Sequence, residues 1–93
     1  MKILIAEKES HLSSELAPIC SAEGLEIFSC NEDQEFVFMT RQLSPFAIVI
    51  ESGFVDDNQK LLDGLRSVVS FKDIPVLFIC SNTEEMKSIL DLS

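Results

Sequence analysis

The sequence predicts an α/β fold in which one parallel sheet is covered by helices on both faces. Unbroken runs of β-branched and other apolar residues recur along the chain, at 3–6, 47–50 and 76–80. Runs of this length are typical of strands buried on both faces, the setting of a parallel sheet. Segments with helical periodicity lie between the runs, and such alternation gives right-handed crossovers between parallel strands.

The first half of the chain holds two predicted helices and a weaker strand. After the strand at 3–6, a predicted helix has apolar residues at helical spacing: Leu12, Leu16, Ile19 and Cys20. Gly24 then supplies its C-terminal stop. The segment 25–30 mixes polar and apolar residues, which is typical of a strand at a sheet edge. A second helix is expected to begin near Asn31, with Gln34 completing a capping box and Phe36 on its inner stripe.

The second half repeats this alternation. After the strand at 47–50, a third helix is expected to carry its apolar residues on one face: Leu61, Leu62, Leu65, Val68 and Val69. The strand at 76–80 follows, and a last helix is expected to begin near Asn82 or Thr83, where Glu84 and Glu85 favour its N-terminus.

Strand character also predicts strand order. The second strand suits a sheet edge, whereas the first and third suit the centre, which gives the order 2-1-3-4. This is the start of the flavodoxin-like winding. The strand at 76–80 is then the other edge, although it has no charge or proline. Because a flat apolar edge recruits a partner strand, we expect contacts with another chain there.

Composition restricts the classes of partner. The chain has 93 residues, and we expect residues 1–93 to form a single domain. Seven Lys and Arg stand against sixteen Asp and Glu, a formal net charge of −9. Because an acidic surface repels phosphate backbones and anionic membranes, neither nucleic acid nor a membrane is an expected partner.

The cysteines and the histidine suggest no metal or disulfide chemistry. Cys20, Cys30 and Cys80 are odd in number and form no CxxC pair. Together with the lack of a signal-peptide segment, this favours a reducing, cytoplasmic location. His11 has no second ligand candidate nearby in the sequence, so we expect no catalytic or metal-binding role for it.

Topology predicts where chemistry is located. Ligands of open parallel sheets bind beyond the carboxyl ends of the strands, where the winding direction switches. Glu7 and Lys8 leave the first strand there, Glu51 ends the third, and Cys80 or Ser81 leaves the fourth. We therefore expect these side chains to converge on one small patch.

The chain resembles the receiver domain of two-component response regulators (CheY-like) from Met1 to about Leu90. The resemblance lies in MKILIAEKES, the stop at Gly24, SPFAIVIES and DIPVLFICS, with its Asp-Ile-Pro lead into a strand. It implies a role in a phosphorelay. In such receivers two acidic residues after the first strand hold Mg²⁺, and an Asp ending the third accepts a phosphoryl group from a histidine kinase. A hydroxyl residue ends the fourth strand, and a Lys ends the fifth.

This sequence departs from that pattern at nearly every matched position. Glu7 matches the first acidic position, whereas Lys8 reverses the charge of the second. Glu51 matches the phosphoacceptor, and Cys80, with Ser81 next to it, matches the hydroxyl position. The sequence contains no match to the family's fifth strand and last helix. Two explanations stay open: a naturally short form and a piece of a longer chain.

The departures predict altered chemistry. A lysine among the ligands repels Mg²⁺, since a unit charge pair at ~4 Å is worth about 4 kcal/mol at an effective dielectric of ~20. We therefore expect no cofactor, and Lys8 between Glu7 and Glu51 in place of the ion. Three interpretations stay open: an inert ion-pair cluster, a signalling state fixed by Glu51 as a partial phosphate mimic, and Mg²⁺ or phosphate binding through another geometry.

The expected function is a non-phosphorylatable receiver, a pseudo-receiver that acts by binding proteins. An enzyme using Glu7, Glu51 and Cys80 is disfavoured, because neither a base partner for the thiol nor a Gly-rich phosphate loop lies near. The alternative is a dimerising assembly module. We expect a homodimer formed through the fourth strand, the last helix or the sheet face that the family's final helix would cover.

Overall fold

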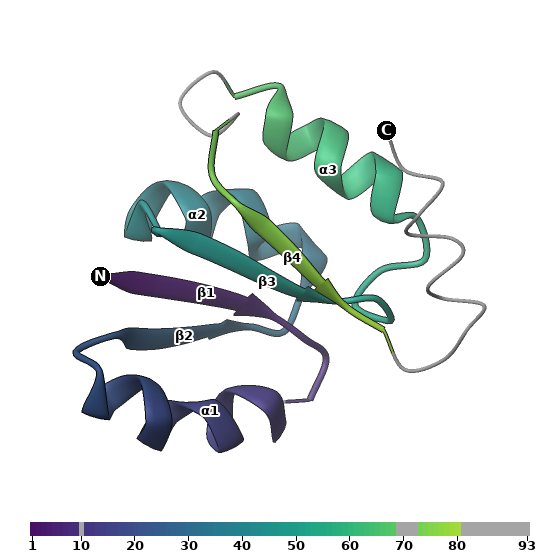
Figure 1. Ribbon diagram of the computed structural model, residues 1–93. Helices are drawn as coiled ribbons and strands as arrows, with labels where there is room; N and C mark the ends of the chain where they lie inside the picture. Colours follow the sequence, from purple (N-terminus) through teal and green to yellow (C-terminus); the bar gives the residue numbers. More distant parts are fainter. Residues whose placement is uncertain (10, 69–72, 81–93) are drawn as a thin grey trace.

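The computed structural model describes residues 1–9, 11–68 and 73–80, and these residues form the predicted α/β fold (Figure 1). The elements alternate along the chain: β1 (Lys2–Ala6), α1 (His11–Ala22), β2 (Glu26–Cys30), the 3-10 turn η1 (Asp33–Glu35), α2 (Phe36–Leu43), β3 (Ala47–Glu51), α3 (Asn58–Arg66) and β4 (Val76–Ile79). The helix expected near Asn82, like Val69 and Ser81, lies outside the described residues.

All four strands are parallel and lie in the order β2-β1-β3-β4, so the predicted strand order is confirmed. In register, Leu4 of β1 is level with Phe28 on one side and Ile48 on the other. Because the strands are parallel, their carboxyl ends meet at one edge of the sheet.

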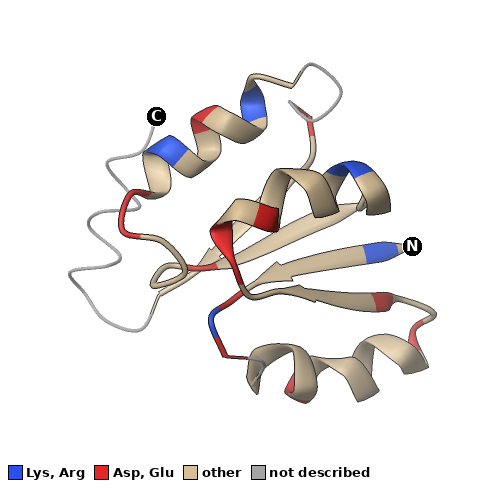
Figure 2. Cartoon of the chain, turned by 180° about the vertical axis from the view of Figure 1, so that it is seen from behind, with Lys and Arg blue, Asp and Glu red and all other residues tan. Residues whose placement is uncertain are grey.

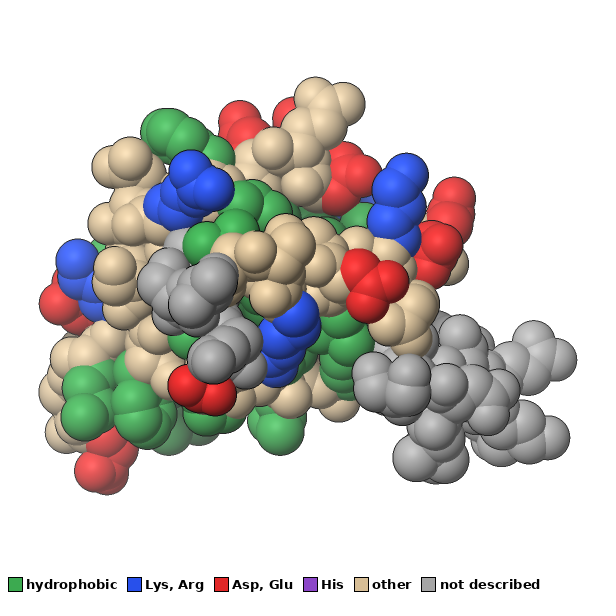
Figure 3. All heavy atoms as spheres, turned by 90° about the horizontal axis from the view of Figure 1, so that it is seen from above, with side chains coloured by type: hydrophobic (Ala, Val, Ile, Leu, Met, Phe, Trp, Pro, Cys, Tyr) green, Lys and Arg blue, Asp and Glu red, His purple; other side chains and the backbone are tan. Residues whose placement is uncertain are grey.

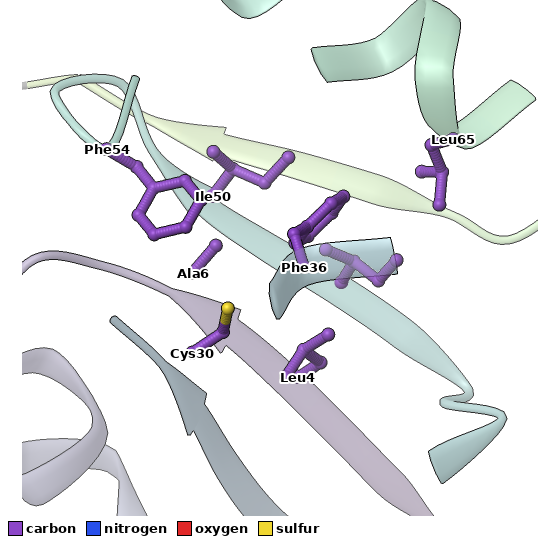
Figure 4. Close-up of a cluster of buried hydrophobic side chains, with 8 residues drawn as sticks. Leu4, Ala6, Cys30, Phe36, Ile50, Phe54 and Leu65 are labelled. Carbon is purple, nitrogen blue, oxygen red and sulfur yellow. The ribbon is translucent and has the colours of Figure 1, made fainter. Parts of the chain in front are cut away.

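The main core lies between the sheet and the pair α2 and α3, which cover the same face (Figures 1 and 4). Alternate residues of the strands point into it: Leu4, Ala6, Cys30, Ile48 and Ile50. Phe36 of α2 and Leu65 of α3 fill the space above them, and Phe36 packs at a tilt on Phe54 with ring centroids 6.2 Å apart. The predicted inner position of Phe36 is therefore confirmed.

The opposite face is covered unevenly. Helix α1 lies over it on the side of β2 and β1 (Figure 1). Three residues on this face are level with one another in register, and their exposure increases across the sheet. Ile5 of β1 is fully buried, Val49 of β3 is half-buried, and Leu77 of β4 is 65% exposed. The β4 side of this face thus presents apolar side chains to solvent.

The start of the second helix differs from the prediction. Asn31 is not its cap: the helical segment begins with η1, and α2 begins at Phe36 with no side-chain cap. Instead, the Asn31 side-chain amide donates a hydrogen bond to the Glu7 carbonyl at 3.0 Å. The capping-box prediction is wrong because Asn31 is needed to link the ends of two neighbouring strands.

The other helix ends follow their local chemistry. Gly24 has the left-handed φ of +77° that lets the chain turn out of α1, and the Leu25 N–H donates to the Cys20 carbonyl. Asp57 caps α3 by accepting the Lys60 N–H at 3.0 Å. Helix α3 ends at Arg66, so Val68 lies beyond it and packs on the core from the following turn.

Candidate functional site

Residues from three strand ends are placed at the carboxyl edge of the sheet. Glu7 directly follows β1, Glu51 is the last residue of β3, and Cys80 directly follows β4. Strand register pairs Ala6 with Ile50 and Glu51 with Ile79, which makes these positions neighbours across the edge. Many of the acidic residues lie in the loops of this edge (Figure 2).

Glu7 is a fully buried carboxylate that holds the first turn of α1. One of its carboxylate oxygens accepts the Leu12 N–H and the other accepts the Ser13 N–H, both at 3.0 Å. The N–H groups of a first helical turn have no partner within the helix, and the helix dipole favours a negative charge there. These contacts compensate the burial of the charge and make Glu7 a structural cap.

His11 lies between the two carboxylates. Its Nδ1 is 4.0 Å from Oε1 of Glu7, and its Nε2 is 3.6 Å from Oε2 of Glu51. These separations exceed hydrogen-bond distances, so the contacts are charge–charge contacts that act when the imidazole is protonated. The ring is 58% exposed, whereas the Glu51 side chain is 23% exposed.

The structure corrects the expectation for Lys8. Its side chain is exposed and, within the part of the chain that is described, forms no ion pair with Glu7 or Glu51. The Glu7 side chain turns inward to cap α1, and the first residue of that helix, His11, is thereby brought over the edge. Sequence reasoning missed His11, because Glu7 lies outside α1 and the contact of His11 with Glu51 joins segments far apart in the sequence.

The loop after Glu51 is anchored by two hydrogen bonds of Ser52, one to β4 and one from the start of α3. The Ser52 N–H donates to the Ile79 carbonyl at 2.8 Å, and the Asn58 side-chain amide donates to the Ser52 carbonyl at 3.2 Å. Phe54, between them, is buried in the main core. Glu51 therefore sits on a well-anchored turn, while Ser81, the second candidate for the hydroxyl position, lies outside the described residues.

The donors at this edge do not fit the Mg²⁺ site of a receiver. Mg²⁺ needs several oxygen ligands in octahedral geometry. Both carboxylate oxygens of Glu7 already accept amide hydrogen bonds, and the donor beside Glu51 is an imidazole nitrogen. In residues 1–9, 11–68 and 73–80, no group of three His, Cys, Asp or Glu side chains is arranged to hold a metal ion.

The buried thiol of Cys30 is part of the core and not of the site. Burial raises the pKa of the Cys30 thiol, an interaction with the Glu32 backbone lowers it, and the nearby carboxylates of Glu35 and Asp33 raise it further. The net pKa is raised, so the thiol stays protonated and is a poor nucleophile.

Comparison with known proteins supports the fold class. No protein-family model and no curated protein sequence matches the chain. Among solved structures, a response regulator from Desulfuromonas acetoxidans superposes with a TM-score of 0.80 and 20% identity, over 96% of this chain and 74% of that one. A sensor protein from Polaromonas sp. JS666 gives a TM-score of 0.79 and 17% identity, over 98% and 72% of the two chains.

These similarities establish the fold. The chain has the CheY-like receiver fold of response regulators, as the sequence predicted, with its four-stranded sheet in the order β2-β1-β3-β4. Both solved chains extend beyond the part that this chain matches. Among the described helices, none is long and apolar enough to cross a membrane.

Proposed function

We propose that this chain is an atypical receiver domain that signals by binding other proteins and does not accept a phosphoryl group in the usual way. The observation that carries the proposal is the contact at the phosphoacceptor position. Glu51 stands there in place of Asp, with the His11 imidazole 3.6 Å from its carboxylate. The group beside the carboxylate is thus a side chain of the protein itself.

Phosphoryl transfer needs fixed positive charge around the moving group, and metal ions usually provide it. Here Glu7 is engaged as the cap of α1, and Lys8 stands exposed where the family has a second acid. The proposal therefore includes no Mg²⁺ cofactor and no catalytic role for Glu7, Glu51 or Cys80. His11 and Glu51 instead lie in contact at the edge.

The test is incubation with acetyl phosphate and Mg²⁺, followed by intact-mass measurement. We expect the protein to keep its unmodified mass, while an active receiver treated alongside gains one phosphoryl group. The matched variant Lys8→Asp/Glu51→Asp restores the family's residues at two positions, and its modification would trace the loss to them. Stoichiometric, Mg²⁺-dependent phosphorylation of the unaltered chain would contradict the proposal.

We further propose that the β4 side of the sheet self-associates. Two apolar residues of β4 lie on the face that α1 leaves open, Leu77 at 65% and Ile79 at 37% exposure. The strand is the outermost of the described sheet, and an apolar edge without charges favours pairing. This supports the alternative role of a dimerising module, which is compatible with the first.

A further inference from the structure

A groove lies between α2 and α3, on the face of the sheet opposite α1. Its volume is about 380 Å³, and it is lined from η1, from the start of α2, from the loop after β3 and from α3. Val37, Val55 and Leu61 form its apolar part. We call it the α2–α3 groove. Its lining residues do not include Glu7, His11 or Glu51.

The rim of the α2–α3 groove is acidic. Asp33 lines it from η1, and Asp56 and Asp57 line it from the loop, with Lys60 the one basic residue among the lining residues. On the face that carries α3, acidic side chains gather toward one end (Figure 3). Asp57 already accepts the Lys60 N–H, so the N-terminus of α3 is capped and offers no site for an anion.

Gly64 keeps the α2–α3 groove open on the side of α3. It is a lining residue in the middle of the helix, and a Cβ placed on it would meet no atom within 4 Å. A Cβ at this position is therefore accommodated without a close contact.

We propose that the α2–α3 groove docks a basic, amphipathic segment of a partner protein, with aliphatic side chains on Val37, Val55 and Leu61 and Lys or Arg on the rim. This inference rests on the proposed role in protein binding and names the surface and the chemistry of the partner. The volume is that of a small ligand pocket and accommodates a few aliphatic side chains. The net charge of −9 steers a basic partner toward the molecule.

The test is a titration of the full chain with a synthetic helical peptide, followed by backbone chemical shifts. The peptide carries leucines at positions i, i+3, i+4 and i+7 and lysines elsewhere. We expect saturable binding with shifts centred on Val37, Leu61 and Gly64. Peptides with glutamates for the lysines, or serines for the leucines, should bind at least about tenfold more weakly.

Variants separate the groove from general attraction to an acidic protein. At Gly64 an added Cβ meets no atom within 4 Å, and Gly64→Met, which places a longer side chain at the lining of the groove, should weaken binding about tenfold. The pair Asp33→Asn/Asp56→Asn should weaken binding about fivefold, because it removes rim charges. The pair Glu15→Gln/Glu23→Gln removes the same charge at exposed positions on and just after α1, and should change binding less than about twofold.

Three outcomes would overturn the inference: unsaturable binding, equal weakening by both charge pairs, or shifts centred on β4. Failure of this inference and failure of the proposed function are read separately. The groove is judged by peptide binding and shift mapping, whereas phosphorylation at Glu51 is judged by intact mass.

Discussion

At the scale of single residues, the site is organised by how one buried carboxylate is used. Both carboxylate oxygens of Glu7 accept backbone N–H groups of the first turn of α1. With α1 held in this position, His11 lies beside Glu51 and Lys8 is exposed to solvent. The Glu7 carboxylate thus serves the start of the helix. The consequences can be measured as changes in stability.

Glu7→Gln should destabilise the fold. A glutamine has one carbonyl oxygen and one NH₂ group in place of the two carboxylate oxygens. It can therefore accept only one of the Leu12 and Ser13 N–H groups, and the other loses its partner. We expect the free energy of unfolding in urea to fall by roughly 2 kcal/mol. Glu9→Gln, two residues away and exposed, is the control and should stay within about 0.5 kcal/mol. Equal losses in the two variants would contradict the role of Glu7 as a cap.

Cys30 should make stability depend on alkaline pH. Its folded pKa is raised above the ordinary thiol value of 9.0, so the unfolded chain loses the thiol proton first. The contribution is fully present below the unfolded pKa and is lost as pH rises through the folded pKa.

In Cys30→Ala, this alkaline part of the stability curve should disappear, whereas Cys20→Ala, outside the core cluster, should retain it. Urea unfolding measured from neutral to alkaline pH checks both variants. An unchanged slope in Cys30→Ala would show that other groups control it.

At the scale of elements, a glycine that ends a helix and a glycine inside a helix have opposite effects on stability. Gly24 follows α1 with φ of +77°, a conformation that costs other residues free energy. Gly64 lies inside α3 without such a requirement and has open space around its Cα. The same substitution should therefore act in opposite directions at the two positions.

Gly24→Ala should lower the free energy of unfolding by about 1 kcal/mol, because alanine is strained in the left-handed region. Gly64→Ala should raise it by roughly 0.5–1 kcal/mol, because alanine is the better helix former. Thermal unfolding of the two variants beside the parent chain measures both effects. A loss of stability in Gly64→Ala would contradict this, because it would show that position 64 requires glycine.

At the scale of the whole molecule, the described residues place two helices on one face of the sheet and α1 over part of the other (Figure 1). This asymmetry leaves apolar residues of β4 in contact with solvent, despite an overall charge of −9 that favours repulsion between copies. Self-association should therefore strengthen as salt screens the charge.

Leu77→Lys should abolish self-association measured by light scattering over a range of protein and salt concentrations. Phe38→Lys is the matched control, since Phe38 is similarly exposed, at 62%, but lies on α2. It should leave the measured mass unchanged. A monomeric parent chain at high concentration, or equal effects of both variants, would contradict association through β4.

The sequence by itself determined the strands, their order and the inner position of Phe36, because burial on both faces and helical spacing are written in local patterns. It also located the candidate site at the carboxyl ends of the strands, since topology alone brings them to one edge.

Only the tertiary structure decided that His11 and not Lys8 faces Glu51, that Asn31 links two strands, and that a groove opens between α2 and α3. Each of these features depends on contacts between strand ends and helix starts that are far apart in the sequence. The direction of the side chains there follows from tertiary contacts that no local sequence pattern encodes.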